Sequence, residues 1–240
     1  MRFLRSLEGR VKLLKNPFRN LTGFEKCLWI SSLAVVTISS LISGKFDTLS
    51  LLASLVGVTA LIFLARGYVF GQVLVIIFSV FYAIVSYEQR YYGEMITYLC
   101  MTAPMAAFCI VSWLKNPYGN SGEVKVNRLT KLTALLTFLI TSAVTVVFYF
   151  LLDALGNESL FVSTLSIFTS FFAAALTFLR SPLYAIGYAI NDIVLIVLWI
   201  IAAVEDPGAY SVVACFVAFL ANDLYGFISW SRMKKRQSGE

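Results

Sequence analysis

The sequence contains no histidine among its 240 residues. Histidine is the most frequent general base and a common metal ligand, so its absence removes imidazole-based catalysis and the HExxH protease motif. The four cysteines, Cys27, Cys100, Cys109 and Cys215, lie singly in apolar stretches and form no CxxC pair. A nucleotide-binding loop of the GxxxxGK[ST] type is also missing. We therefore expect no metal site, no cofactor and no enzymatic activity.

Charge is scarce as well, because charged residues make up 13% of the chain and hydrophobic residues 59%. A soluble domain typically has about 25% charged and about 45–50% apolar residues. The apolar excess recurs along the whole chain instead of forming one anchor. This composition predicts an all-α, polytopic membrane protein, since helices satisfy their own backbone hydrogen bonds in lipid.

About eight apolar stretches approach the roughly 20 residues that a helix needs to cross a bilayer. We place them at about 24–43, 48–65, 68–87, 94–114, 132–153, 159–179, 183–203 and 208–230. Three basic segments flank or separate them: an N-terminal segment at 1–23, a loop at 115–131 and a tail at 231–240. The N-terminal segment fits either an amphipathic helix on the membrane surface or a solvated arm.

The basic residues alternate between the two sides of the membrane that this span count defines. If the N-terminus lies inside, the inner segments hold most Lys and Arg residues, and the outer segments hold only Lys45 and Arg90. Cytoplasmic loops carry such an excess of Lys and Arg. We therefore expect both termini to be cytoplasmic.

Two parts of the chain have a common plan of three spans closed by a Ser-Trp pair and a basic residue. The matched pairs are Phe63-Leu64 with Phe178-Leu179, and Ser112-Trp113 with Ser229-Trp230. We predict two parallel three-helix repeats, at 48–114 and 159–230, joined by a linker helix at 132–153, with 24–43 as an extra N-terminal helix. Such halves can rock around a site between them, which favours a transporter with alternating access over a receptor or scaffold.

The stretch 182–199 is apolar enough to cross a bilayer, yet it carries Asn191 and Asp192 side by side near its centre. Tyr184 and Tyr188 lie upstream at helical spacing, so all four residues fall on one face of a helix. A carboxylate at mid-membrane costs at least about 2.5–3.5 kcal/mol on insertion scales. We therefore predict that this face lines a polar site inside the bundle.

Other spans contribute further polar and aromatic groups. The predicted substrate-binding residues are Tyr184, Tyr188, Asn191, Asp192, Asn222, Tyr225, Gln72, Tyr82 and Thr97. The spans also hold Glu94, Tyr98, Trp199 and Asp223, which we do not include, and no second acid is evidently paired with Asp192. The alternative interpretation is that Asn and Asp join helices and Tyr lies in the interfacial belt.

A carboxylate among tyrosine rings suits a flat cation, through charge neutralisation and cation–π attraction. The amides of Asn191 and Asn222 suit the hydroxyls of a sugar or a carboxamide. The expected substrate is a small, positively charged heterocycle of nucleoside size. An intramembrane enzyme and a scaffold are the alternatives from other classes; the lack of histidine and of a paired-acid motif counts against the enzyme.

Three segments of the chain resemble the PnuC family of bacterial vitamin-precursor transporters. They are YEQRYYGEMITYLCMTAPMAAFCIVSWLKN at 87–116, PLYAIGYAIND at 182–192 and NDLYGFISWSRMKK at 222–235. The resemblance implies uptake of nicotinamide riboside across the bacterial inner membrane by facilitated diffusion, with a cytoplasmic kinase trapping the product. It also implies a homotrimer. We expect contact with membrane lipid along the spans, and no nucleic-acid partner, because the placement of the basic residues already explains the net charge of +6.

The chain departs from the family in one segment. Nicotinamide riboside members typically carry tryptophans followed by an asparagine in the helix that matches 182–199, whereas this chain has Tyr184 and Tyr188 followed by Asn191-Asp192. Which of the two polar residues takes the place of the asparagine is open by one position. The alternative substrate within the family is thiamin, which is also a flat cation, or another nucleoside-like vitamin.

Overall fold

The computed structural model describes residues 17–42, 47–119, 121–157, 159–205 and 207–239. Its elements in chain order are η1 (Pro17–Asn20), α2 (Gly23–Ile42), α3 (Thr48–Ala65), α4 (Val69–Glu88), α5 (Tyr92–Ile96), η2 (Thr97–Thr102), α6 (Ala103–Lys115), α7 (Lys131–Ala154), α8 (Leu160–Phe178), α9 (Tyr184–Glu205), η3 (Pro207–Ala209) and α10 (Tyr210–Ser238). Most of the predicted basic segment at 1–23, and Lys45, lie outside the described residues.

Within the described residues, eight helices are long and apolar enough to cross a membrane, with α5, η2 and α6 together forming one of them. The all-α prediction with about eight spans is therefore confirmed. The last helix runs on to Ser238, through most of the segment expected as a tail, and it ends where Gly239 adopts a positive φ of 74°. Glycine takes this left-handed conformation without steric cost, which is why it commonly ends helices.

Side-chain caps set several helix starts. The Asp47 carboxylate accepts hydrogen bonds from the backbone N–H groups of Leu49 and Ser50, at 3.0 and 2.9 Å, directly before α3. At the start of α2, the backbone N–H of Thr22 donates to Glu25 Oε2 at 2.6 Å, and the N–H of Glu25 donates to the Thr22 hydroxyl at 3.3 Å. These bonds satisfy N–H groups that have no partner within a helix.

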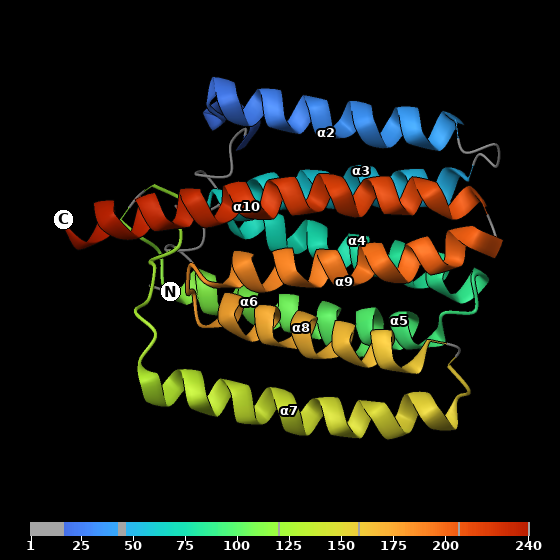
Figure 1. The fold of residues 1–240 in the computed structure, drawn as a ribbon. Coiled ribbons are helices and arrows are strands. Elements are labelled where there is room, and N and C mark those ends of the chain that lie inside the picture. Colours follow the sequence, from blue (N-terminus) through green and yellow to red (C-terminus); the bar gives the residue numbers. More distant parts are fainter. Residues whose placement is uncertain (1–16, 43–46, 120, 158, 206, 240) are drawn as a thin grey trace, which may run out of the picture.

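Six of the spans form a closed ring. Going around it, α3 packs on α4, α4 on α6, α6 on α8, α8 on α9, α9 on α10, and α10 on α3. The helix α2 lies against α3 and α10, and α7 lies against α8, so these two flank the ring on opposite sides (Figure 1). Only 22% of α2 and 17% of α7 are buried, against 33–50% of the other spans, as expected for helices at the periphery.

The fourth span is irregular in its middle. Its residues Thr97–Thr102 form a π-helical segment between α5 and α6, and Pro104 follows at the start of α6. Proline lacks an N–H group and clashes with the carbonyl of the fourth residue before it, so it disturbs a regular helix. Local widening into a π-helix is one way to accommodate this, and such segments occur often at functional sites.

Each Ser-Trp pair of the chain binds the end of a helix in the other predicted repeat. Ser112 Oγ donates to the Phe178 carbonyl at 3.0 Å, and Trp113 Nε1 donates to the Thr177 carbonyl at 3.1 Å. In the same way, the Ser229 hydroxyl and the Trp230 indole donate to the carbonyls of Ala65 and Leu64 at 2.7 and 2.8 Å. By these contacts Ala65 of the first repeat corresponds to Phe178 of the second. The sequence comparison aligns Phe63 with Phe178, which is two positions earlier.

Candidate substrate site

Three carboxyl groups lie buried within the six-helix ring. Glu94 on α5 is 1% exposed, and Asp192 on α9 and Asp223 on α10 are each 3% exposed. A charged side chain inside a membrane protein is costly, and such groups usually face a partner, a wet cavity or a ligand. The part of the ring around these three acids is therefore the candidate site for a polar ligand.

Asp192 and Asp223 lie within hydrogen-bonding reach of each other, so the two side chains form a pair. The second oxygen of Asp192, Oδ2, has no hydrogen-bond partner among the described residues. Two carboxylates that share a site repel each other, and a shared proton or a bound cation removes this repulsion. This pair is not evident in the sequence, because Asp223 is distant along the chain and meets Asp192 only where α9 packs on α10.

Glu94 lies in an aromatic environment and is the least satisfied of the three acids. Neither of its carboxyl oxygens has a hydrogen-bond partner among the described residues. Tyr82 and Tyr98 lie within its electrostatic range, and Ser166 is also nearby, although the Ser166 hydroxyl is directed to Asn191 Oδ1 at 3.5 Å. Sequence reasoning left Glu94 out of the site; the available signal was an acid just inside an apolar span.

Aromatic rings surround these acids on the side of Glu94. The ring centroids of Tyr82 and Tyr98 are 4.3 Å apart, and Trp199 lies 6.0 Å from Tyr82. Trp199 Nε1 donates a hydrogen bond to the Tyr82 hydroxyl at 2.7 Å. Tyr98 and Trp199 were not among the predicted site residues, whereas Tyr82 was, and the structure places all three in one cluster.

The predicted residues on α9 divide between two neighbours. Asn191 Oδ1 accepts hydrogen bonds from the hydroxyls of Thr169 at 2.8 Å and Ser166 at 3.5 Å, so its amide faces α8. Asp192, the next residue, faces Asp223 on α10. Because adjacent helical residues point in different directions, one of them binds α8 and the other binds α10.

The two predicted tyrosines of α9 also lie in different surroundings. Tyr188 is half-buried and lies within electrostatic range of both Asp192 and Asp223. Tyr184 is 1% exposed and packs its ring edge-on against Trp230, with centroids 4.9 Å apart. Of these two tyrosines, Tyr188 is therefore the one that lies close to both acids of the pair.

The four remaining candidates form hydrogen bonds with groups other than the three acids or, at Gln72 Nε2, have no partner among the described residues. Asn222 Nδ2 donates to Ser32 Oγ on α2 at 2.9 Å, and the Tyr225 hydroxyl donates to Glu25 on α2 at 2.8 Å. The Thr97 hydroxyl donates to the Gly93 carbonyl of its own helix at 2.8 Å, and Gln72 Nε2 is buried without a partner among the described residues. For Asn222 and Tyr225 these contacts favour helix association, and their substrate role stays a prediction.

In the part of the chain that the structure describes, eight helices long and apolar enough to cross a membrane enclose a buried acidic and aromatic core, an arrangement typical of a multi-pass membrane transporter. The chain belongs to the nicotinamide mononucleotide transporter family, whose sequence profile matches residues 47–232. This membership confirms the resemblance to PnuC proteins and the expectation of a transporter instead of an enzyme.

Relatives agree with this assignment over nearly the whole chain. The nicotinamide riboside transporter PnuC of Neisseria mucosa is 25% identical over 247 residues, covering 99% of this chain and 94% of the relative. PnuC of Haemophilus influenzae is 23% identical over 211 residues, covering 87% of this chain and 90% of the relative. A crystal structure of the vitamin B3 transporter PnuC superposes with a TM-score of 0.79 at 24% identity, over 98% of this chain and 99% of that one. This last likeness supports the fold.

Proposed function

We propose that this protein takes up nicotinamide riboside across the bacterial inner membrane by facilitated diffusion. The family and the names of the two relatives support the substrate, and the buried Asp192–Asp223 pair is the observation in this chain that carries the proposal. Nicotinamide riboside contains a pyridinium ring, whose positive charge suits an acidic pair. A cytoplasmic kinase would retain the product by adding a phosphate.

The proposed binding mode uses groups from both predicted repeats. Asp192 and Asp223 neutralise the cation, while Tyr188 and Tyr98 offer ring faces to a flat heterocycle. Asn191 is held by Thr169 and Ser166, which fixes its amide for a hydrogen bond to a sugar hydroxyl or a carboxamide. Tyr184, Tyr82, Gln72 and Thr97 form the next layer of this proposed site, and Asn222 and Tyr225 act through the attachment of α2.

Transport in this proposal proceeds by alternating access. The Ser-Trp contacts hold the two repeats together at the end of the bundle where α10 ends, so rocking around this end would open and close the acidic core. The distribution of Lys and Arg in the sequence supports a cytoplasmic location for both termini. We also propose a homotrimer, on the basis of the family resemblance.

Thiamin is a second candidate substrate, and one observation in this chain favours it. Tyr184 and Tyr188 stand where nicotinamide riboside members typically carry tryptophan, which changes the ring surface that the substrate meets. Thiamin is also a flat cation, so the acidic pair suits it equally well. The two substrates are therefore compared in the same experiment.

Uptake of radiolabelled nicotinamide riboside into proteoliposomes that contain only this chain tests the proposal, with thiamin as competitor. We expect saturable uptake, and we expect Asp192→Asn to weaken substrate binding by about tenfold or more, because two opposite charges about 4 Å apart attract each other by about 4 kcal/mol at an effective dielectric constant of about 20. Asp153→Asn, at an exposed acid on α7, is the matched control. Unchanged affinity in Asp192→Asn would remove the acidic pair from the binding site, and uptake of thiamin alone would replace the substrate.

A further inference from the structure

A cavity of about 560 Å³ lies at the end of the bundle where α2 begins and α10 ends. Its lining includes Glu25, Arg66, Glu123, Ile228, Arg232 and Arg236. Pockets for small ligands usually measure about 300–1,000 Å³. The three buried carboxyl groups of the ring do not line this cavity, so it is separate from the proposed substrate site.

Both acids in the lining already have partners. Glu25, 1% exposed, lies 3.6 Å from Arg66 Nη1 and accepts a hydrogen bond from the Tyr225 hydroxyl at 2.8 Å. Glu123 forms an ion pair with Arg236. Three arginines and two glutamates therefore leave one positive charge in the cavity wall.

The surplus positive charge belongs to Arg232, which forms no ion pair with any described residue and is exposed. Arg66 is a further donor: its side chain is 22% exposed, and its guanidinium makes only long contacts with described residues, with Nη1 3.6 Å from Glu25 and Nη2 3.4 Å from the Tyr68 hydroxyl. A guanidinium carries five N–H donors and matches the oxygen atoms of a phosphate. The cavity wall thus offers N–H donors and positive charge to an anion.

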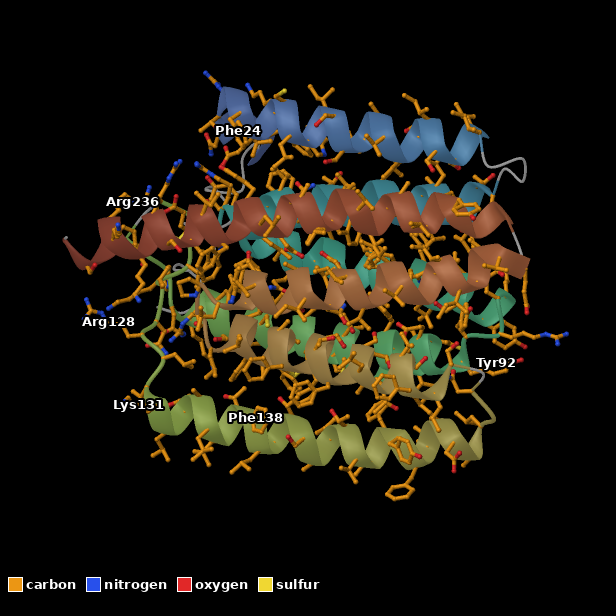
Figure 2. All side chains as sticks on the ribbon, viewed as in Figure 1. Phe24, Tyr92, Arg128, Lys131, Phe138 and Arg236 are labelled. Carbon is orange, nitrogen blue, oxygen red and sulfur yellow. The ribbon has the colours of Figure 1, made fainter. Side chains whose placement is uncertain are left out.

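The open side of the cavity is apolar. Phe24 of α2 is 63% exposed and Ile228 of α10 is 47% exposed, and Figure 2 shows Phe24 and Arg236 at the same end of the bundle. Leu224, 49% exposed, lies one helical turn from Ile228 on the same face of α10 and extends this apolar surface toward the membrane interior. A molecule that fits both surfaces has an anionic head and an apolar tail.

We propose that the cavity binds the phosphate headgroup of an anionic phospholipid. Arg232 and Arg66 donate to the phosphate oxygens, and an acyl chain lies along Ile228 and Leu224. Basic pockets between membrane helices at the membrane surface are known to hold such headgroups. Because the cavity spans α2 and α10, a bound lipid joins the peripheral helix to the six-helix ring. This inference does not depend on which substrate the protein transports.

Native mass spectrometry of the purified protein, titrated with phosphatidylglycerol or phosphatidylcholine, tests the proposal. We expect Arg232→Gln to bind phosphatidylglycerol about fivefold more weakly, since one basic residue near an anionic lipid surface contributes about 1 kcal/mol. Arg232→Lys keeps the charge and should retain most of the affinity. Lys235→Gln removes the same charge from the same exposed part of α10 but does not line the cavity, so it is the matched control.

Three results would overturn the proposal. The first is equal affinity for phosphatidylglycerol and phosphatidylcholine in the unmodified protein. The second is an equal loss of affinity in Arg232→Gln and Lys235→Gln, which would mean that only the overall charge of the helix end matters. The third is complete displacement of bound phosphatidylglycerol by glycerol 1-phosphate. This result would mean that the cavity binds a free phosphate ester instead of a lipid.

Discussion

The indole N–H of Trp230 donates to the backbone carbonyl of Leu64 at 2.8 Å, across two helices of different predicted repeats. Trp113 makes the corresponding bond to Thr177, and the two indole rings lie 5.5 Å apart. Both tryptophans are at most 1% exposed. Each bond adds a second donor to a carbonyl at the end of α3 or α8, because the backbone N–H groups of Gly67 and Arg180 already donate to Leu64 and Thr177 at 2.8 and 3.0 Å.

Trp230→Phe should therefore destabilise the protein without abolishing its fold. The substitution keeps an aromatic ring but removes one of the hydrogen bonds to the Leu64 carbonyl, which retains the Gly67 N–H donor at 2.8 Å, so we expect a cost of about 0.5–1.5 kcal/mol. For a chain of this size each kcal/mol lowers the melting temperature by about 2–4 °C, which thermal unfolding in detergent can measure. Trp113→Phe should have a similar effect, because it removes the equivalent bond. A melting temperature unchanged in both variants would show that these bonds are not structural.

Gly71 allows α3 and α4 to approach each other closely. A Cβ atom at this position would lie 2.8 Å from the Leu64 backbone nitrogen and 3.0 Å from the Ala60 carbonyl oxygen. Such contacts with backbone force the helices apart, so Gly71→Ala should destabilise the protein by about 1–3 kcal/mol. Gly23→Ala, where nothing lies within 4 Å, is the control for thermal unfolding. Equal melting temperatures for the two variants would contradict the close packing.

Tyr82 and Trp199 form a buried pair whose strength can be measured directly. Trp199 Nε1 donates to the Tyr82 hydroxyl at 2.7 Å, and both residues are at most 3% exposed. Tyr82→Phe should destabilise the protein by about 1–3 kcal/mol, because the indole N–H then lacks its acceptor. The double variant Tyr82→Phe with Trp199→Phe should lose less unfolding free energy than the sum of the losses in the two single variants, since it removes the donor as well as the acceptor. Additive costs in thermal unfolding would mean that the bond is not formed.

The sequence predicts the class and the span count well, because a membrane helix carries its own signal in length and hydropathy. It also indicates Asp192, since an acid in the middle of an apolar span stands out. It does not indicate that Asp192 meets Asp223 or that Glu94 lies beside Tyr82 and Tyr98. The first contact depends on how α9 packs on α10, and the second on how α4 packs on α5 and η2. A periodic pattern does not specify how a helix is rotated toward its partner.

The same limit explains the two candidates on the last span. Asn222 and Tyr225 look like site residues in the sequence because they are polar and lie within an apolar helix. In the structure their hydrogen bonds reach Ser32 and Glu25 on α2. The helix α2 lies outside the predicted repeats. A prediction based on the repeats alone therefore directs these two side chains toward the interior of the bundle, whereas they bind α2.

Glu94 provides a test of whether the acidic core is kept for binding at the expense of stability. Its carboxyl is 1% exposed, and neither oxygen has a hydrogen-bond partner among the described residues. Replacing an unpaired buried acid by its neutral amide removes most of the desolvation cost of the charge. Glu94→Gln should therefore raise the melting temperature, by about 2–4 °C for each kcal/mol gained.

The same substitution should weaken the preference for a cation. In proteoliposomes that contain Glu94→Gln, we expect uptake of nicotinamide riboside to fall, because a negative charge has been removed beside the aromatic cluster. Glu88→Gln, at an exposed acid at the end of α4, is the matched control and should change neither stability nor uptake. A variant at Glu94 that is more stable and equally active would show that this acid is not needed for binding. A variant that is less stable would show that the carboxyl has a structural partner.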